Sequence, residues 1–412
     1  MDNLTHTIIG LGAGELIQRS LAPEPDAQRQ SLRRRLLLLS CALASNFPDL
    51  DLFLTKLLPD PLGYLLNHRG HTHTLVYALP QALLLAALLW LCWPGARALL
   101  RQSGVARLGL AISTLTGLAL HMLMDYTNSF GIHPLYPFDG RWFFGDMVFI
   151  VEPLFWVAFG VPLALMLRRV GARVAVLGGL AAALGFFAFK GYLGWASCLG
   201  LGVLALLTGM AQRRSGDAGR AGLLLALGVS VGFIGLQGVA SHAGRQAVTA
   251  AVLQRDAGAQ VVDVAMTAFP SQPLCWAFVS MEVNEGKGRY RLRRGVASVA
   301  PQWLAPLACP RALVERGAVT ELSPALVQFS QQDASLSALR TLQKDNCFAD
   351  AWLRFGRVPA LDLVGGSLSD YRFAVTPAGN FTTLPLEMAK HAACPQGVPR
   401  WDYPRAGVLM AP

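Results

Sequence analysis

Two consecutive apolar stretches decide the fold: VAVLGGLAAALGFFAFK at residues 174–190 and YLGWASCLGLGVLALLTGMA at residues 192–211. Each approaches the roughly 20 apolar residues that an α-helix needs to cross a bilayer. Four more stretches of this kind lie at about 75–93, 108–124, 148–167 and 221–240. The chain is therefore predicted to be a polytopic α-helical membrane bundle with six full spans.

The composition supports this fold class. Of the 412 residues, 53% are hydrophobic and only 15% are charged, whereas a soluble protein carries about a quarter charged residues. The net charge of +10 could indicate a nucleic-acid partner, but arginines in the loops between membrane helices explain it better. We therefore expect the lipid bilayer as a partner and no nucleic acid.

Two earlier apolar runs, at about 7–18 and 36–47, are shorter. At about 1.5 Å per residue neither crosses a bilayer alone, so they are predicted to be short N-terminal helices buried among the others. No basic stretch precedes the first run, which argues against a cleaved signal peptide.

Arginine clusters predict the orientation of the chain. They occupy every second predicted connection, as the positive-inside rule requires of cytoplasmic loops. Their members are Arg33, Arg34 and Arg35; Arg97, Arg101 and Arg107; Arg168, Arg169 and Arg173; and Arg213, Arg214 and Arg220. The other connections, at 48–74, 125–147 and 190–192, are then expected on the outer face, with the N-terminus and everything after about residue 241.

The chain divides into two predicted domains. Residues 1–241 form the membrane-embedded part, and residues 242–412 are long enough for an extracytoplasmic α+β domain. Alternating apolar and polar residues over 272–299 predict a β-hairpin, and 371–375 resembles another strand. Helical spacing covers 334–355.

Cysteine usage bears on the compartment of the second domain. The polar C-terminal region contains four cysteines, which in an exported domain suit two disulfides with three alternative pairings. They are Cys275, Cys309, Cys347 and Cys394. A cytoplasmic domain could equally hold four reduced thiols, so the sequence leaves both states open.

Six of the eight histidines lie before residue 134, in short polar clusters between the apolar stretches. Imidazoles and carboxylates are costly near hydrocarbon, so they mark a functional site by default, and a metal ion is the expected occupant. His121 and Asp125 are four residues apart near a helix end, where they share a face and can bind one cation. The same spacing also suits a plain hydrogen-bonded pair. Asn128 and His133 follow closely and favour the metal site.

A second cluster reads His68-Arg69-Gly70-His71-Thr72-His73. An extended chain would place His71 and His73 on one face, whereas a helix would place His68 and His71 together. The three imidazoles are therefore not expected to bind as one set. Arg69 could anchor the loop at the interface or hold an anionic oxygen of a substrate, because guanidinium suits bidentate phosphate contacts.

Carboxylates accompany these histidines. Asp49 and Asp51 follow a proline-initiated turn, and their oxygens complement imidazoles around zinc or manganese. Asp49 suits a ligand and a turn equally, whereas Asp51 is expected to form the turn or to support the ligands. Asp146 and Glu152 lie in or beside the loop after His133. A metal ion, or Arg141, would offset the cost of the Glu152 charge.

Four motifs in order resemble the YdjM/YbcI-type inner-membrane proteins, which are regarded as metal-dependent hydrolases. The motifs are Met1-Asp2 with Thr5-His6; Ser45-Asn46-x-Pro48-Asp49-x-Asp51; His68-Arg69-Gly70-x-Thr72-His73; and His121-x3-Asp125-x2-Asn128-Ser129-x-Gly131. The resemblance covers residues 1–160 in detail. It implies a multi-pass protein of the bacterial inner membrane. The family is itself thought similar to the zinc-dependent phospholipase C and single-strand nuclease superfamily.

Carried over residue by residue, the resemblance implies one to three divalent ions, zinc foremost. The implied ligands are His6, Asp49, either His68 or His73, His121 and Asp125, with His133 as a further ligand. The second His-x3-Asp pair of the superfamily is not evident after His133, and Asp146 and Glu152 are the candidates to replace it.

Metal-assisted hydrolysis is the expected chemistry. A bound zinc would lower the pKa of a water molecule toward about 7, and an unligated carboxylate among Asp51, Asp146 and Glu152 would take the proton. A site at the outer leaflet predicts a phosphoester of a lipid or envelope precursor as substrate. A metal or proton transporter and a non-catalytic envelope scaffold remain as alternatives.

Overall fold

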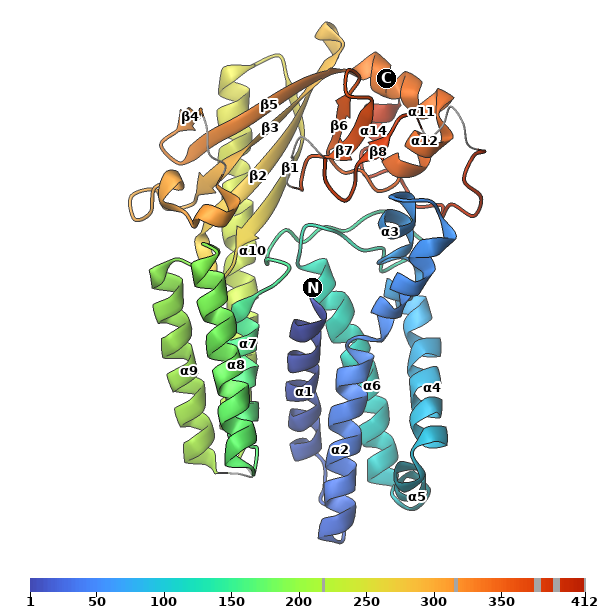
Figure 1. Cartoon of the computed structure of the whole chain (residues 1–412), viewed down its shortest axis with the longest axis vertical. Coiled ribbons are helices and arrows are strands. Elements are labelled where there is room, and N and C mark those ends of the chain that lie inside the picture. Colours follow the sequence, from blue (N-terminus) through green and yellow to red (C-terminus); the bar gives the residue numbers. More distant parts are fainter. Residues whose placement is uncertain (217–218, 315–317, 374–378, 388–392, 411–412) are drawn as a thin grey trace.

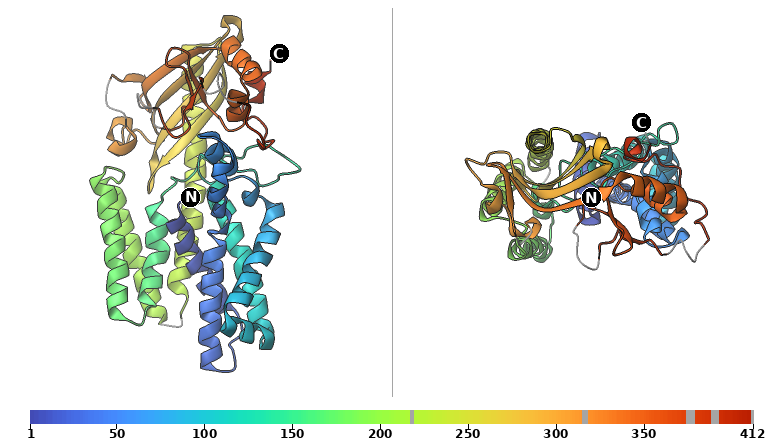
Figure 2. Two further views of the ribbon diagram at one scale, coloured as in Figure 1. Left: turned by 45° about the vertical axis from the view of Figure 1, so that its right-hand side comes forward. Right: turned by 90° about the horizontal axis from the view of Figure 1, so that it is seen from above.

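The computed structural model describes residues 1–410, apart from 217–218, 315–317, 374–378 and 388–392. Helices of the first 240 residues stand side by side as a bundle, and an α+β part built from later residues lies over one end of it (Figure 1). Figure 2 shows the same arrangement from two further sides. The fold is thus the predicted helical membrane bundle with a C-terminal α+β domain.

The elements of the bundle fall into two groups. The long and medium helices are α1 (Asn3–Ser20), α2 (Ala27–Ala44), α4 (Leu75–Cys92), α5 (Pro94–Gln102), α6 (Gly104–Tyr126), α7 (Pro153–Leu165), α8 (Val170–Phe189), α9 (Trp195–Ser215) and α10 (Ala221–Arg255). The short elements near the C-terminal domain are η1 (Phe47–Leu57), α3 (Leu62–Asn67) and η2 (His71–His73).

Six of the described helices are long and apolar enough to cross a membrane, as predicted, but the set differs. The segment predicted at 148–167 contains only the 13-residue α7, because the helix starts at Pro153, where Glu152 caps its first turn. A candidate span at Ala27–Leu57 takes its place. The sequence prediction of a short helix at 36–47 missed this span because α2 starts well before its apolar run, with Asp26 as N-cap.

Arg33, Arg34 and Arg35 lie inside α2 rather than in the predicted loop. The Arg33 side chain is buried, and its guanidinium donates hydrogen bonds to Gln18 Oε1 at 3.0 Å and to Glu24 Oε1 at 3.1 Å. Partners on the preceding helix and connection therefore allow a buried arginine here, which a count of loop charges could not reveal.

Small residues bring the first helices close together. A side-chain carbon on Gly14 of α1 would lie 2.9 Å from the Leu37 carbonyl oxygen of α2, and one on Gly117 of α6 would lie 2.5 Å from that of Cys41. Only glycine therefore permits this backbone approach, which is typical of membrane helices. The result is a tight α1–α2–α6 core that fixes the ends of these helices relative to one another.

An antiparallel five-stranded sheet in the order β1-β2-β3-β5-β4 forms the first part of the C-terminal domain. Its strands are β1 (Gln260–Phe269), β2 (Gln272–Asn284), β3 (Arg289–Ser298), β4 (Thr320–Ser323) and β5 (Leu326–Ser335). The predicted hairpin over 272–299 is confirmed by β2 and β3, which pair from Cys275 with Ser298 to Asn284 with Arg289. Helix α10 continues out of the bundle and packs Val248 and Val252 against this sheet, so the predicted boundary at 241/242 falls inside one helix.

The remaining elements complete the domain. They are α11 (Leu336–Asp345), α12 (Cys347–Leu353), β6 (Pro359–Asp362), β7 (Ser367–Asp370), β8 (Leu384–Pro385) and α14 (Ala406–Leu409). Helices α11 and α12 confirm the helical segment predicted over 334–355. Residues 371–373 form a turn instead of the predicted strand, and residues 374 and 375 lie outside the described part of the chain.

The four cysteines of the C-terminal domain pair as Cys275–Cys309 and Cys347–Cys394. The cysteines of the helical bundle, Cys41, Cys92 and Cys198, are free. Of the two states that the sequence leaves open, the structure therefore contains two disulfides.

The C-terminal domain rests on the short elements at the end of the bundle. One hydrophobic core contains Leu62 and Leu66 of α3 together with Trp352 and Trp401. The Trp401 indole donates a hydrogen bond to the Leu66 carbonyl oxygen at 2.9 Å. The two domains therefore share a core at the level where the polar clusters of the sequence lie.

Candidate metal centre

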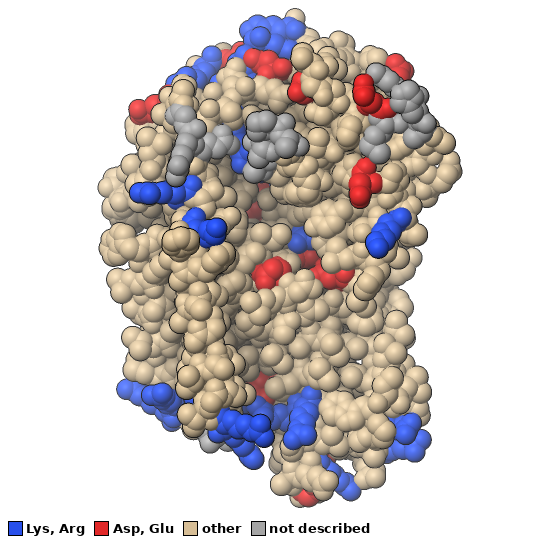
Figure 3. All heavy atoms as spheres, viewed as in Figure 1, with Lys and Arg blue, Asp and Glu red and all other residues tan. Residues whose placement is uncertain are grey.

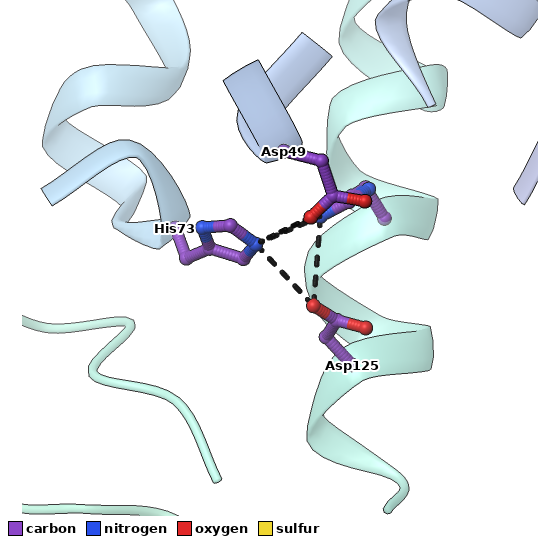
Figure 4. Close-up of side chains that lie close together, drawn as sticks. Asp49, His73 and Asp125 are labelled. Atoms are coloured by element: carbon purple, nitrogen blue, oxygen red, sulfur yellow. Dashed lines mark hydrogen bonds and ion pairs between the residues drawn. The ribbon is translucent and has the colours of Figure 1, made fainter. Parts of the chain in front are cut away.

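The polar clusters converge at the end of the bundle that faces the C-terminal domain. They come from the start of α1, from η1 directly after α2, from the connection before α4, and from the last turns of α6 (Figure 1). Four side chains form the inner cluster: Asp49, His73, His121 and Asp125. All four are buried, and each offers one ligand atom within 4.8 Å of the other three. Figure 4 shows Asp49, His73 and Asp125 pointing toward one another.

The donor atoms of the inner cluster lie close together. His73 Nε2 and His121 Nε2 are 2.9 Å apart. Asp49 Oδ1 lies 3.5 Å from the first nitrogen and 3.6 Å from the second, and Asp125 Oδ2 lies 3.3 and 3.5 Å from them. Two imidazoles and two carboxylates therefore surround a single point.

The outer hydrogen bonds of the two imidazoles fix their tautomers. His121 Nδ1 lies 2.7 Å from the Ser45 carbonyl oxygen, and His73 Nδ1 lies 3.1 Å from Asp51 Oδ2. Both partners accept, so each ring holds its proton on Nδ1 and directs the lone pair of Nε2 inward. Two lone pairs at 2.9 Å beside two carboxylates repel one another unless a proton or a metal ion lies between them. Backbone and carboxylate partners of this kind are typical of metal-bound histidine.

The charge balance also favours a cation. Asp49, Asp51 and Asp125 contribute three carboxylates, whereas the buried cationic groups beside them are the Arg69 guanidinium and the α-amino group of Met1, which contacts Asp125 Oδ1. Arg69 Nε lies 3.0 Å from Asp125 Oδ2, and its Nη1 donates to Asn128 Oδ1 at 2.8 Å. The site remains net negative unless a histidine is protonated or a cation binds.

His6 contacts the inner cluster but is not one of its four members. Its ring stacks on that of His121 with 4.1 Å between centroids, and its Nε2 lies 3.4 Å from Asp125 Oδ1. Neither ring nitrogen has a hydrogen-bond partner among the described residues, although both are buried. Unsatisfied buried imidazole nitrogens are costly, so a bound ion or water is expected to contact them.

Asp51 and His68 form a supporting pair. Asp51 Oδ1 lies 2.9 Å from His68 Nδ1, while its Oδ2 accepts from the Arg69 backbone N–H at 2.9 Å and from Thr72 Oγ1 at 2.7 Å. Asp51 therefore orients His68 and His73 and stabilises the turn between them. Burial lowers the pKa of His68, so this imidazole is neutral at pH 7. Of the two alternatives that the sequence left open, His73 lies in the inner cluster, and His68 joins Asp49 and Asp51 in a second set of donors.

His133 lies outside both sets. Its ring stacks on Trp401 and packs against the tilted ring of Trp142, with centroids 4.2 and 3.8 Å away, and its Nδ1 lies 3.2 Å from the Gly140 carbonyl oxygen. Burial lowers the pKa of His133 to about 3. His71 likewise packs on the Trp401 ring, at 4.9 Å. These two histidines connect the loops to the C-terminal domain, and the implied role of His133 as a metal ligand has no support from its position.

Asp146 and Glu152 are also outside the site, because both are bound by residues of later segments. Both oxygens of Asp146 accept from Arg357 at 2.8 Å. Glu152 Oε2 accepts from the Ser271 backbone N–H at 3.1 Å, and burial raises the pKa of Glu152 to about 7. Neither carboxylate is available as the proton acceptor that the sequence suggested. Glu152 is satisfied by Ser271 and the N-terminus of α7, and Arg141 pairs with Asp139 instead.

Residues of the C-terminal domain that surround the site could not be found from local sequence patterns. Arg372 donates to the Phe130 carbonyl oxygen at 3.3 Å, and the Arg69 guanidinium carbon lies 4.8 Å from the centre of the Phe130 ring. A pocket of about 330 Å³ opens beside this ring, between the loops of the bundle and the sheet. Its lining includes Arg294 and Arg372, and Arg372 is ion-paired with Asp370 at 2.8 Å. Most of the lining is apolar, from Tyr64, Phe130, Val148, Phe149, Ile150, Ala277, Phe278, Val279, Leu313, Phe373 and Phe381.

A known protein family matches the N-terminal part of the chain. Residues 1–198 match the sequence model of the family described as YdjM inner membrane protein. With its six apolar helices, the chain is a multi-pass inner membrane protein. This confirms the resemblance that the four motifs indicate, and every residue of the inner cluster lies within the YdjM region.

A curated relative also aligns with part of the chain. The protein YfhP of Bacillus subtilis (strain 168), described as uncharacterized, is 25% identical over 158 residues. The alignment covers 38% of this chain and 44% of YfhP, so the chain matches less than half of that relative's length. No solved structure matches the chain. The YdjM match ends inside α9 and leaves the C-terminal domain outside it.

Proposed function

We propose that the chain is a metal-dependent hydrolase that cleaves a phosphoester of a lipid or an envelope precursor at the membrane surface. The observation that carries this proposal is the convergence of four buried donor atoms from Asp49, His73, His121 and Asp125, with the imidazole lone pairs directed inward. Buried charged groups are costly and seldom add stability, so a site of this composition supports a functional role.

The donor set suits zinc. Four donors around a tetrahedral zinc, each at about 2.0–2.2 Å, lie about 3.3–3.6 Å from one another, and the donor separations quoted for the inner cluster run from 2.9 to 3.6 Å. A divalent cation bound there would act as a Lewis acid toward a phosphoryl oxygen and would make water a stronger nucleophile near pH 7.

The protein side chains have separable roles in this proposal. Asp51 holds the His73 ring in the tautomer that a ligand needs and orients His68 beside it. Arg69 pairs with Asp125 and supplies positive charge for an anionic substrate. His68 is neutral and retains a lone pair on Nε2, so it takes the proton-accepting role for which Asp146 and Glu152 are unavailable.

The surroundings of the site support an amphiphilic substrate. The pocket of about 330 Å³ beside Phe130 is largely apolar, which suits an acyl chain, and Arg294 and Arg372 lie in its wall. Figure 3 shows Lys and Arg side chains gathered at the end of the bundle away from the C-terminal domain, with a broad band of mostly uncharged side chains above them. By the positive-inside rule, that basic end faces the cytoplasm. The metal centre and the disulfide-bonded domain would then lie on the outer face, where disulfides persist.

The proposal is tested on the full chain purified in detergent. Metal content is measured by mass spectrometry beside turnover of bis(p-nitrophenyl) phosphate and of phosphatidylglycerol, for the wild type and for His121→Ala and Asp125→Ala. His242→Ala is the matched control, because His242 is an exposed imidazole on α10, outside the cluster. We expect bound divalent metal and turnover in the wild type and the control, and loss of both in the cluster variants.

Other outcomes identify the alternatives. Metal flux across proteoliposomes without turnover would establish a transporter, and retained metal without turnover or flux would leave a structural metal in a scaffold. A wild type that binds no divalent metal would overturn the proposal.

A further inference from the structure

A groove lies between α4, α5 and α6, at the end of the bundle opposite the metal centre (Figure 1). Its volume is about 730 Å³, and its wall is apolar apart from one threonine and two arginines. The lining residues along α4 run from Leu79 to Trp90, and those on α6 end at Leu115. Leu79, Leu83 and Leu115 are exposed, so the groove opens toward the hydrocarbon that surrounds a membrane helix.

The dimensions of this groove match one leaflet. From Leu79 to Trp90, α4 rises by about 16 Å, roughly half of the 30 Å hydrocarbon core. Helix α4 ends at Cys92, directly beyond the groove, so the polar boundary of the bilayer falls at this end. A groove of this length and position accommodates the acyl chain of a lipid from that leaflet.

Two arginines stand at the end of the groove where a lipid headgroup would lie. The Arg101 guanidinium carbon lies 5.5 Å from the centre of the Trp90 ring, and Arg107 Nη1 donates to the Leu100 carbonyl oxygen at 2.9 Å. Neither arginine has an acidic partner in the described part of the chain. The nearby carboxylate of Glu24 is bound by Arg33 at 3.1 Å and by Ser103 at 2.8 Å. Positive charge at the polar boundary is therefore left without an anion from the protein.

We infer that this groove binds an anionic phospholipid of the arginine-rich leaflet, with one acyl chain along α4 and the phosphate between Arg101 and Arg107. Charge complementarity selects an anionic lipid over a zwitterionic one, because basic pockets between membrane helices attract anionic headgroups. Trp90 covers the boundary between chain and headgroup, a position that tryptophan favours. The site is distinct from the metal centre, so it does not depend on the proposed hydrolase activity.

The test is quenching of Trp90 fluorescence by brominated lipids in delipidated, detergent-solubilised full chain. The Trp90 signal is the difference between the wild type and Trp90→Phe. Brominated phosphatidylglycerol is expected to quench at a concentration roughly tenfold lower than brominated phosphatidylcholine with the same chains. In Arg101→Gln/Arg107→Gln, the two lipids should quench alike.

Two further variants distinguish lipid binding in this groove from general electrostatic attraction between anionic lipid and the protein. Arg213→Gln/Arg214→Gln removes the same charge from the end of α9, outside the groove, and should keep the preference for phosphatidylglycerol. Ala87→Phe fills the exposed groove while it keeps both arginines, and should weaken quenching by either lipid. Equal quenching by both lipids in the wild type, equal loss of preference in the two double variants, or unchanged quenching in Ala87→Phe would each overturn the inference.

Discussion

Arg357 forms a two-pronged ion pair with Asp146, a residue 211 positions earlier, with both nitrogen–oxygen distances at 2.8 Å. Both side chains are buried, and Arg357 also binds Asp263 of β1 at 2.6 Å. The planar guanidinium group of arginine is well suited to such bidentate contacts with a carboxylate. This pair links the loop between α6 and α7 to the C-terminal domain through charge rather than through packing alone.

Arg357→Met is expected to lower the free energy of unfolding by about 1.5–3 kcal/mol, because Asp146 and Asp263 lose their buried partner and keep only the more exposed Arg245 and Arg405. Denaturant unfolding in detergent, followed by tryptophan fluorescence, measures the loss. Arg291→Met is the control, since Arg291 pairs with the more exposed Asp333 and should cost less than about 1 kcal/mol. A loss for Arg357→Met no larger than that of the control would contradict the structural role given to this pair.

Asp51→Asn is expected to weaken zinc binding by about 10–100-fold without abolishing it, because Asp51 orients the proposed ligand His73 through a hydrogen bond. Isothermal titration with zinc of chelator-treated protein measures this change. Asp49→Asn removes a donor of the inner cluster and should have the larger effect, while Asp139→Asn, on the exposed side of the loop, should have none. The supporting role is wrong if Asp51→Asn binds zinc as tightly as Asp139→Asn does.

His133 predicts a pH dependence of stability. Its pKa falls from the ordinary value of 6.5 to about 3 on folding, so the folded state disfavours the protonated ring. The resulting stability is fully present above pH 6.5 and is lost as the pH falls toward 3. Between pH 7.5 and pH 5 the wild type should lose about 2 kcal/mol more unfolding free energy than His133→Phe does. Measuring both proteins at both pH values cancels any loss that comes from the metal centre, and parallel losses would refute the prediction.

The disulfides predict a pattern of thiol reactivity. In unreduced protein, a maleimide–polyethylene glycol reagent in mild detergent should modify the exposed Cys92 and leave Cys275, Cys309, Cys347 and Cys394 unmodified. Reduction should then release four more sites. Replacing Cys275 and Cys309 by serine should lower the unfolding free energy by about 2–4 kcal/mol, because the bridge closes a long loop. Modification of the four cysteines before reduction would show that they are thiols.

The parts of the fold that depend on local pattern were predictable. Apolar length gave the membrane bundle, and alternation around the Glu285 turn gave the β2–β3 hairpin. The ends of the helices were not predictable in this way, because they depend on contacts with other segments of the chain. Arg33 is accommodated inside α2 because its side chain donates hydrogen bonds to Gln18 and Glu24. Helix α7 is short because it begins at Pro153, with Glu152 as its N-cap.

The inner cluster was predictable for a similar reason. The four-residue spacing places His121 and Asp125 on one face of α6. Polar residues at the ends of other helices lie close to this pair because the helix ends lie side by side. The resemblance implied His133 as a further ligand, and Asp146 and Glu152 were the candidates to replace a missing His-x3-Asp pair. Asp146 and Glu152 instead contact Arg357 and Ser271, and His133 stacks on Trp401; these three partners lie more than 100 residues away, beyond any local pattern.

The order in which the chain is made bears on how the metal centre matures. The segments that carry the ligands leave the ribosome first, whereas Trp401, which bonds to Leu66 and stacks on His133, is synthesised nearly last. During translation the helices that carry the proposed ligands are therefore present before the C-terminal domain packs over them. If the proposed metal binds, it would reach the nascent site from the aqueous side before the final segment docks, and the finished domain would then cover it.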